Sequence, residues 1–280
     1  MNFVIINNQI IKEDQAFISV QERGFRFGDG VFETCRVFDG IIYNSEAHFE
    51  RLRSAIEAIK IKIDLQDLKN NCQKLIKKNS LKNGLIRIYI SRGIGSIGYL
   101  PINDIKPLTV IETLEMPTLG LFPIKLFLSE ITKISIKSLP INYKLAQGLN
   151  STLARMEAVE KRYFDAVLLN EAGEICETSS ANIFWIKNNI LYTPAKECGI
   201  LLGTTRQKII DLSSIKIAQV KTKINELLNA DEVFLTNASL GIIAVDQFME
   251  KKYLQKKYSG IFTNLLNQDI KNYVNLAKSA

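Results

Sequence analysis

Short apolar segments joined by turn-forming residues constrain the fold of this chain most. Residues 31–38 and 41–43 flank Asp39-Gly40, a pair that strongly favours a tight hairpin turn. Further hairpins are expected at residues 3–6 with 10–11, 166–170 with 174–177, and 183–186 with 190–192. Because a tight turn joins antiparallel neighbours, the chain is expected to form sheets connected mainly by hairpins.

Helical periodicity appears between these strands. We expect a helix that Ser45 is placed to cap, because apolar residues recur at spacings of three and four residues, at Phe49, Leu52, Ile56 and Ile59. Further helices are expected at residues 65–79, at about 150–162 and from Thr204 onward, and further strands at 85–91, 107–114, 124–129 and 232–236. The mixture indicates an α/β protein of the α+β type.

A chain of 280 residues is long enough for two domains. Residues 116–123 contain two prolines and a glycine, and no periodic pattern crosses them. We therefore expect an N-terminal domain at 1–117, a linker at 118–123 and a C-terminal domain at 124–280.

Charge and composition narrow the class of protein. The 36 Lys and Arg residues against 29 Asp and Glu give a net charge of +7, but the lysines are scattered and form no basic run, so a nucleic-acid partner is not expected. No apolar run is long enough to span a membrane, and the first residues lack a signal-peptide pattern. The expected location is the cytoplasm, without a membrane partner.

The rare residues exclude several chemistries. His48 is the only histidine, so it would have to serve any His-based zinc site or Ser-His-Asp triad, and a hydrogen-bonding role suits it better. The four cysteines are far apart and form no CxxC pair, which favours reduced thiols. No metal is expected, and the chemistry should rest on Lys, Arg and carboxylates or on a cofactor.

A literal GxGxxG motif follows the strand expected at residues 85–91, at Gly93 to Gly98. A dinucleotide site needs a helix to open on that loop, so that its amides face the pyrophosphate. The next residues, 99–104, include Pro101 and have no helical period, which argues against a Rossmann site.

Three separate motifs carry a family resemblance. They are the glycine-rich stretch of residues 23–36, the His-x-x-Arg-Leu motif at residues 48–52, and the Glu-Thr-Ser-Ser-Ala-Asn string at 177–182, which is followed by Gly199 to Arg206. In this order they resemble the class IV (fold type IV) pyridoxal-phosphate enzymes over residues 7 to about 241. The resemblance implies a two-domain fold like that of D-amino-acid aminotransferase, with the cofactor in the interdomain cleft.

The resemblance also implies roles for the matching residues. Lys144 matches the Schiff-base lysine, and Glu177 matches the carboxylate that faces the pyridine nitrogen and keeps it protonated. Arg51 matches the phosphate-binding arginine, since a guanidinium suits a phosphate dianion. The remaining phosphate contacts are expected from the helix start at Thr204 and Thr205 and from the loop of Asn237, Ala238 and Ser239.

Two segments resemble the 4-amino-4-deoxychorismate lyases within this family, residues 27–40 and 91–99. In the D-amino-acid branch of the family, a Tyr, an Arg and a His bind the substrate carboxylate. By resemblance, this chain has Phe32, Ile97 and Tyr99 at those positions, so it is not expected to belong to that branch. The lyases carry an arginine where Ile97 stands, so Arg36, Arg92 or another residue must replace it. The expected substrate contacts are therefore Arg36, Phe32, Arg92 and Tyr99.

The lyase reaction would eliminate pyruvate and give 4-aminobenzoate for folate biosynthesis. Lys144 would take the proton at the carbon that bears the amine, and Thr34 would position or protonate the leaving enolpyruvyl group. A branched-chain or other class IV aminotransferase is the close alternative, and a basic binding protein without catalysis is a remote one. By resemblance, the chain is expected to form a homodimer that acts on a small molecule with carboxylates.

Overall fold

The computed structural model describes residues 2–95, 97–120 and 122–279. The chain divides into two compact units, and the first comprises Met1–Pro117, Tyr143–Gln147 and Ile270–Ala280. The second comprises Thr118–Asn142 and Gly148–Asp269. The division after Pro117 falls at the start of the expected linker. Residues 143–147 and 270–280, which the sequence places in the second domain, group with the first unit.

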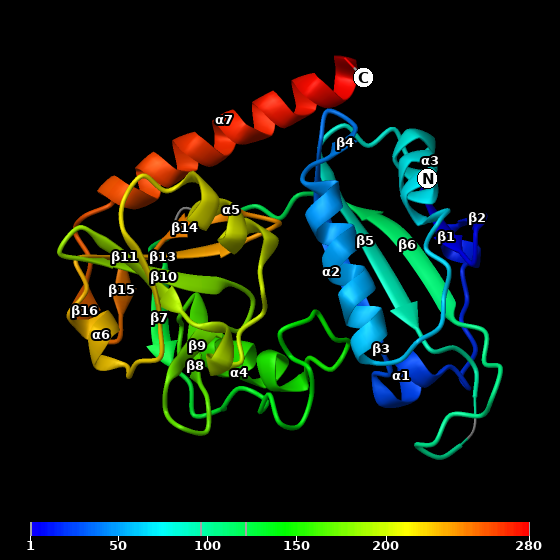
Figure 1. Ribbon diagram of the computed structural model, residues 1–280, viewed down its shortest axis with the longest axis horizontal. Coiled ribbons are helices and arrows are strands. Elements are labelled where there is room, and N and C mark those ends of the chain that lie inside the picture. Colours follow the sequence, from blue (N-terminus) through cyan, green and yellow to red (C-terminus); the bar gives the residue numbers. More distant parts are fainter. Residues whose placement is uncertain (1, 96, 121, 280) are drawn as a thin grey trace. The chain divides into compact units, whose positions relative to one another are not determined.

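The first unit is built on one six-stranded antiparallel sheet (Figure 1). In spatial order its strands are β2 (Gln9–Lys12), β1 (Phe3–Ile6), β6 (Leu108–Leu114), β5 (Gly84–Ser91), β3 (Gly30–Phe38) and β4 (Ile41–Ile42). Both N-terminal hairpins expected from the sequence are present, and β3 and β4 turn at Asp39-Gly40, where both residues have positive φ. The hairpin predictions for this unit are confirmed.

Helices cover one face of this sheet. α2 (Ser45–Ala58) packs against β3, and α3 (Leu68–Lys78) packs against β1 and β6. Their apolar stripes are buried, because Leu52 and Ile56 of α2 and Leu75 of α3 are at most 4% exposed. This unit also contains the 3₁₀ turn η1 (Glu13–Gln15) and the short helix α1 (Arg23–Phe27). On the other face of β3 and β5, most side chains are only partly buried.

Ser45 does not cap α2, so that prediction is wrong. Asn44 is the residue before the helix, in the left-handed conformation with φ 51°, and α2 begins at Ser45 itself. The Ser45 hydroxyl donates instead to Glu46 Oε1 at 3.0 Å and lies 3.1 Å from the Tyr273 hydroxyl. The Ser45 side chain therefore makes a tertiary contact with Tyr273 and does not accept a hydrogen bond from an amide of the first helical turn.

The second unit contains two five-stranded sheets. One has the order β12 (Ile217–Val220), β11 (Ile190–Pro194), β10 (Asn182–Lys187), β13 (Glu232–Asn237) and β14 (Gly241–Ala244). The other has the order β16 (Lys251–Lys252), β15 (Gln247–Phe248), β7 (Lys125–Leu128), β8 (Asp165–Leu169) and β9 (Ile175–Thr178). Hairpins join β8 to β9 and β10 to β11, as expected, whereas β7 and β8 are parallel and are linked through α4 (Leu149–Glu160).

The two sheets of this unit share a buried apolar layer that contains Leu126, Val167, Trp185 and Val233. On the outer face of β10 and β13, Ile209 of α5 (Thr204–Leu212) and Phe262 of α7 (Lys257–Ser279) pack onto Phe184 and Phe234. Ala154 and Ala158 of α4 cover the outer face of β7 and β8. The short helix α6 (Asn225–Leu228) and the 3₁₀ turn η2 (Lys196–Cys198) complete the unit.

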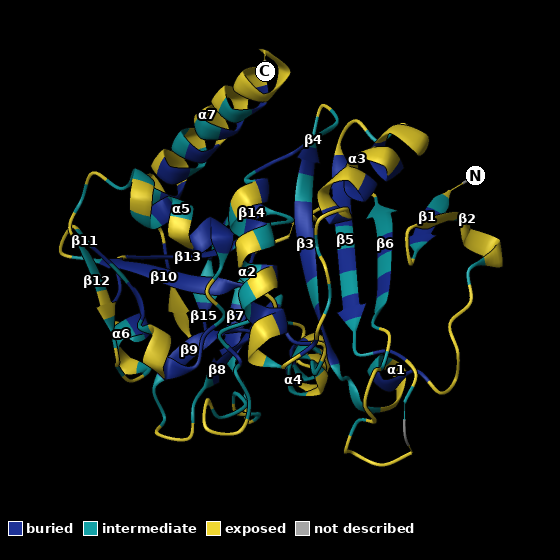
Figure 2. Ribbon diagram, turned by 45° about the vertical axis from the view of Figure 1, so that its right-hand side comes forward, coloured by how far each residue is buried: buried dark blue, intermediate teal, exposed yellow. Residues whose placement is uncertain are grey.

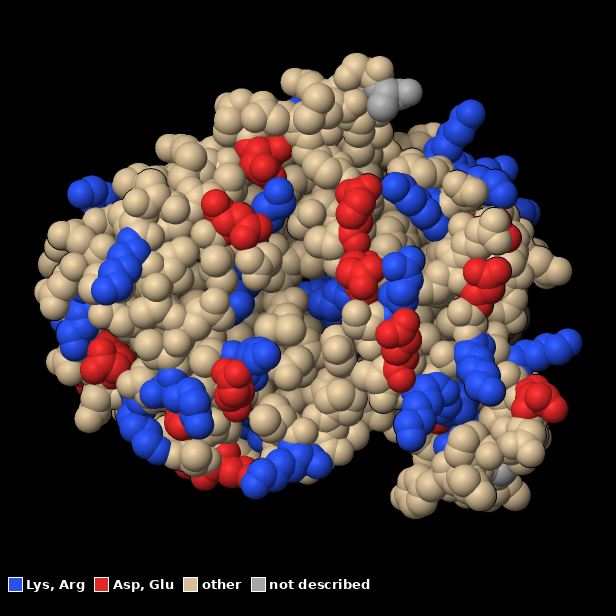
Figure 3. Space-filling model, in the orientation of Figure 1, with Lys and Arg blue, Asp and Glu red and all other residues tan. Residues whose placement is uncertain are grey.

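Burial follows this layering (Figure 2). The strands of both units are mostly buried, and the exposed residues of the helices lie on their outer faces. On the face of the molecule drawn in Figure 3, basic and acidic side chains are interspersed. No helix among the described residues is long and apolar enough to span a membrane.

Candidate active site

In the first unit, Lys144 lies beside the start of β3. The Phe32 amide donates to the Lys144 carbonyl and the Ala146 amide donates to the Gly30 carbonyl, both at 2.9 Å, so this segment runs antiparallel to β3. The Lys144 ammonium lies 4.4 Å from the centre of the Phe32 ring. The sequence predicts a C-terminal domain at 124–280 that includes Lys144, whereas in the structure residues 143–147 group with the first unit and pair with the glycine-rich strand β3.

Phe32, Thr34 and Arg36 share one face of β3 because successive side chains of a strand alternate. Thr34 is buried and accepts a hydrogen bond from Arg87 Nε at 3.3 Å, and Phe32 stacks on Tyr89 with ring centres 5.6 Å apart. Burial lowers the pKa of Arg36, whose guanidinium covers the Phe38 ring. The partly covered face of the sheet therefore combines two arginines, a hydroxyl and an aromatic pair with Lys144.

Arg51 lies over the opposite face of β3 and binds the buried carboxylate of Glu33. Its Nε and Nη2 donate to the two Glu33 oxygens at 2.7 and 2.8 Å, and His48 Nδ1 lies 2.9 Å from Oε2. Burial raises the pKa of Glu33, but Arg51 and His48 outweigh it and lower that pKa to about 2. His48 thus has the hydrogen-bonding contact expected of it. The phosphate role of Arg51 stays a prediction.

Glu33, Cys35 and His48 form a group whose ligand-type atoms lie within 4.8 Å of one another. Both Glu33 oxygens already accept hydrogen bonds from the Arg51 guanidinium. A fixed positive charge in contact with the carboxylate disfavours a second cation. Burial also raises the pKa of the Cys35 thiol, which disfavours the thiolate that a metal requires. The group does not suit a metal.

In the second unit, Glu177 lies in β9 and is 5% exposed. Its Oε2 accepts from Asn182 Nδ2 at 2.9 Å and from the Leu201 amide at 3.0 Å. Its Oε1 accepts from the Lys133 ammonium. The Glu-Thr-Ser-Ser-Ala-Asn string explains part of this arrangement, because a tight turn at 179–181 returns Asn182 to the carboxylate.

The helix α5 begins at Thr204 and Thr205, as expected from the sequence, and both residues are buried. It is preceded by Gly203, where a Cβ would lie 2.0 Å from Asn182 Oδ1. This glycine therefore allows the helix start to approach the Asn182 side chain. The first amides of a helix carry partial positive charge, so the start of α5 suits an anion.

The loop of Asn237, Ala238 and Ser239 begins at the last residue of β13. Asn237 Oδ1 accepts from the Leu240 amide at 2.8 Å, and Asn237 Nδ2 lies 3.4 Å from the Ser180 carbonyl. The loop is therefore tied to the turn that follows Glu177. The neighbouring Thr236 hydroxyl is buried without a hydrogen-bond partner among the described residues.

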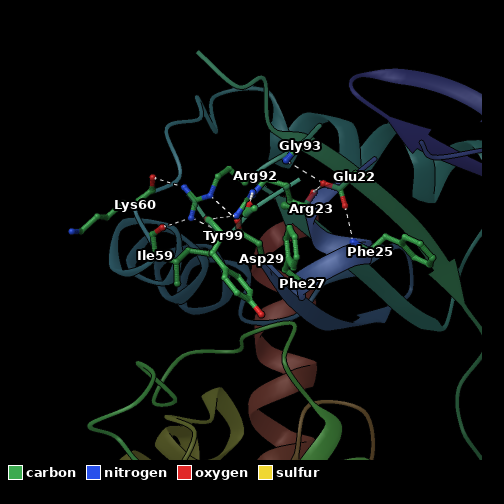
Figure 4. A network of polar contacts seen from close by, with 12 residues as sticks. Glu22, Arg23, Phe25, Phe27, Asp29, Ile59, Lys60, Arg92, Gly93 and Tyr99 are labelled. Carbon is green, nitrogen blue, oxygen red and sulfur yellow. Dashed lines mark hydrogen bonds and ion pairs between the residues drawn. The ribbon is translucent and has the colours of Figure 1, made fainter. Parts of the chain in front are cut away.

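Arg92 lies inside a polar network of the first unit (Figure 4). Its Nε and Nη2 donate to Asp29 at 2.8 and 2.9 Å, and further bonds reach the carbonyls of Ile59 and Lys60. Arg23 also contacts Asp29. These contacts give Arg92 a structural function, and its role toward a substrate stays a prediction.

The loop after Arg92 contains the GxGxxG motif, of which Ser96 lies outside the described residues, and residues 97–107 hold no helix. Arg23 donates to the carbonyls of Gly98 and Tyr99 at 2.8 and 2.7 Å. The Tyr99 side chain is 86% exposed and lies near the Phe27 ring. Its substrate role likewise stays a prediction.

Several residues of these clusters escaped the sequence analysis. Lys133 lies in an irregular segment, where one lysine among many carries no signal. Arg87 lies opposite Thr34 in the paired strand β5, and only the register of the sheet reveals this position. Glu33 could have been found, because it shares its face of the expected strand with the apolar residues Val31, Cys35 and Val37.

Comparison with known proteins identifies the class of enzyme. The family model of amino-transferase class IV matches residues 30–248. Aminodeoxychorismate lyase of Bacillus subtilis is 30% identical over 297 residues, covering 97% of this chain and 96% of its own. A protein of Methanocaldococcus jannaschii, provisionally named a branched-chain-amino-acid aminotransferase, is 29% identical over 275 residues, covering 96% of this chain and 95% of its own.

Among solved structures, the branched-chain amino acid aminotransferase of Escherichia coli matches with a TM-score of 0.90 at 22% identity, covering 94% of this chain and 92% of that one. This similarity shows the fold. The fold and the family match define a fold type IV pyridoxal-phosphate-dependent enzyme. The chain belongs to the class IV aminotransferase family, as the sequence motifs indicated.

The residues present fit pyridoxal 5'-phosphate, the cofactor of this family. In the first unit Lys144 carries an amine, and in the second unit Glu177 provides a buried carboxylate and the start of α5 a helix terminus. Which part of the cofactor each of them contacts stays a prediction. The buried Thr236 hydroxyl is a further polar atom without a partner in the described part of the chain.

Proposed function

We propose that this chain is a 4-amino-4-deoxychorismate lyase, which eliminates pyruvate and yields 4-aminobenzoate for folate biosynthesis. The proposal is carried by Arg36 and Arg87, which flank Thr34 on the same sheet face as Lys144. The substrate has two carboxylates, and guanidinium groups bind carboxylates through charge-assisted hydrogen bonds. The Bacillus subtilis relative named aminodeoxychorismate lyase supports the proposal.

When bound, pyridoxal 5'-phosphate supplies an aldehyde that condenses with amines and a ring that accepts electrons. We assign the covalent attachment to Lys144 and the contact with the ring nitrogen to Glu177. Arg51, Thr204 and Thr205 would bind the phosphate, together with the loop of Asn237, Ala238 and Ser239.

Lys144 would then move the proton from the substrate carbon that bears the amine. The Thr34 oxygen accepts a hydrogen bond from Arg87 Nε at 3.3 Å, so the Thr34 O–H would be the donor that positions or protonates the departing enolpyruvyl group. Arg36 and Arg87 would hold the carboxylates, with Phe32 beneath the Lys144 amine. In this assignment Arg87 supplies the cation that is missing at Ile97, and Arg92 and Tyr99 would bind more distant parts of the substrate.

A branched-chain aminotransferase is the second candidate. It is favoured by the Methanocaldococcus jannaschii relative and by the apolar Phe32–Tyr89 pair beside Lys144, which suits an aliphatic side chain. Relatives named D-alanine aminotransferase also match the chain.

Two assays on the purified enzyme with cofactor distinguish these candidates. The lyase forms 4-aminobenzoate and pyruvate from 4-amino-4-deoxychorismate without an amino acceptor. The aminotransferase forms glutamate from branched-chain amino acids and 2-oxoglutarate. Rapid transamination without 4-aminobenzoate would rule out the lyase proposal.

Variants of two lysines, purified with cofactor in the same way, test which lysine attaches the cofactor. Lys144→Ala should abolish the cofactor's visible absorption band and its fixation by borohydride. Lys137→Ala, at an exposed lysine, should retain both. Loss of the band in both variants, or in neither, would contradict the assignment of Lys144.

A second copy of the chain is the proposed partner. Large apolar side chains are exposed on the first unit around α1 and the loop after Arg92: Phe17, Val20, Phe25, Ile97, Tyr99 and Leu100 are each more than 70% exposed. Exposed apolar surface beyond a few scattered side chains marks protein interfaces. Light scattering should find a dimer, and Ile97→Asp with Leu100→Asp should dissociate it, whereas Leu254→Asp should not.

The four cysteines are buried free thiols. Free thiols persist in reducing compartments, so they support the cytoplasmic location that we infer.

A further inference from the structure

Lys133 forms an ion pair with Glu177 inside the second unit. The two side chains are 13% and 6% exposed. The ammonium contacts Oε1, while Oε2 accepts from Asn182 and from the Leu201 amide. Donors on both oxygens therefore hold the carboxylate in one orientation.

The backbone brings Lys133 to this position through the parallel arrangement of β7 and β8. After β7 the chain continues alongside β8, where the Ser129 amide donates to the Val167 carbonyl and the Lys133 amide donates to the Leu169 carbonyl at 2.8 Å. Leu168 is the register partner of Glu177 in β9. The backbone of Lys133 is thus bonded to Leu169, the residue next to the register partner of Glu177.

The surroundings of Glu177 make this positive charge important. A buried carboxylate without compensation takes up a proton. Arg206 of α5 interacts electrostatically with Glu177, but its hydrogen bonds run to Thr193, Pro194 and Gln219. The adjacent Cys176 thiol has its pKa raised by burial and by Glu177, so it stays neutral. Lys133 supplies the full charge in direct contact with the carboxylate.

We propose that Lys133 is a positioning residue that keeps Glu177 ionised and oriented for the pyridine nitrogen of the cofactor. The inference rests on the proposed cofactor role of Glu177. A carboxylate offers about four lone-pair sites, so the bond from Lys133 leaves acceptor capacity for a ring N–H.

The first experiment uses the protein without cofactor. Infrared difference spectra recorded across a pH series detect the carbonyl stretch of a protonated carboxyl, and Glu177→Gln identifies the band. In Lys133→Met this band should persist to higher pH than in the wild type. Lys133→Arg, which keeps the charge, and Lys137→Met, at an exposed lysine of the same segment, should match the wild type.

The second experiment measures the dissociation constant of pyridoxal 5'-phosphate. Lys133→Met should weaken binding by about tenfold or more, the range expected for a lost hydrogen bond to a charged group, and Lys133→Arg should restore most of it. If Lys133→Met does not fold, as judged by circular dichroism, Lys133→Gln takes its place in both experiments.

An unchanged infrared titration together with an unchanged dissociation constant in the folded variant would overturn the inference. If the wild type binds no pyridoxal 5'-phosphate, the proposed function fails instead. The infrared titration would then still decide whether Lys133 holds Glu177 ionised.

Discussion

Arg51 and Glu33 form a two-pronged ion pair in the first unit, with Nε 2.7 Å from Oε1 and Nη2 2.8 Å from Oε2. Glu33 is 1% exposed, and His48 is the third member of the group. The strand β3 and the helix α2 are therefore joined by a buried charge contact as well as by apolar packing.

Glu33→Gln should destabilise the protein by about 3 kcal/mol, because removing one partner of a buried ion pair leaves the other charge uncompensated. Urea unfolding monitored by circular dichroism measures the change. Glu50→Gln on the exposed side of α2, where Glu50 contacts Arg53, should change stability by less than about 0.5 kcal/mol. Equal effects of the two variants would contradict the prediction.

The same pair predicts a pH dependence. Because the pKa of Glu33 is lowered from 4.5 to about 2 in the folded protein, its stabilisation is present above the unfolded value and is lost as the pH falls through that interval. The difference in unfolding free energy between wild type and Glu33→Gln should therefore shrink from about pH 4.5 toward about pH 2. A difference that stays constant over this range would show that ionisation of Glu33 is not its source.

Gly203→Ala should disturb the start of α5. An added Cβ would lie 2.0 Å from Asn182 Oδ1, so the Asn182 side chain or the helix must move. We expect destabilisation of about 1–3 kcal/mol and, under the proposed phosphate role of Thr204 and Thr205, weaker cofactor binding. Gly260→Ala in α7 is the matched control, since a Cβ there meets nothing within 4 Å, and it should stabilise the protein by up to about 1 kcal/mol. Thermal unfolding distinguishes the two directions.

Arg36→Met tests the substrate assignment. Under the proposed function, loss of a charge-assisted bond to a carboxylate should raise KM by about tenfold or more, with a smaller effect on kcat. Arg53→Met, at an exposed arginine of α2, should leave KM unchanged. Steady-state kinetics with the dicarboxylate substrate would reject the assignment if both variants behave alike.

Arg23→Met should loosen the loop that carries Gly98 and Tyr99, because Arg23 donates to both carbonyls. Chymotrypsin should then cleave after Tyr99 faster than in the wild type. Arg26→Met is the control, since Arg26 is exposed and contacts Val20 instead. Unchanged cleavage would indicate that the Arg92–Asp29 contacts hold the loop without Arg23.

Much of the secondary structure follows from local sequence. The turn at Asp39-Gly40 and the apolar periodicity of Leu52 and Ile56 specify β3, β4 and α2 because turn chemistry and helical period act over a few residues. The family motifs likewise lie in continuous strings, so residues such as Glu177 could be singled out. The strands β12, β14, β15 and β16 and the helices α1, α6 and α7 were not predicted. These strands have only two to four residues each, and α7 packs onto distant residues such as Phe234.

The sequence by itself determined the hairpins, the main helices and the family motifs, since each is written in neighbouring residues. The tertiary structure alone decided which charges meet. Lys133 reaches Glu177 because β7 and β8 are parallel, and Arg87 reaches Thr34 because β5 pairs with β3 in one particular register. These contacts join residues far apart in the chain, and lysine and arginine are too common on surfaces for their pairing to be visible before the backbone has brought them together.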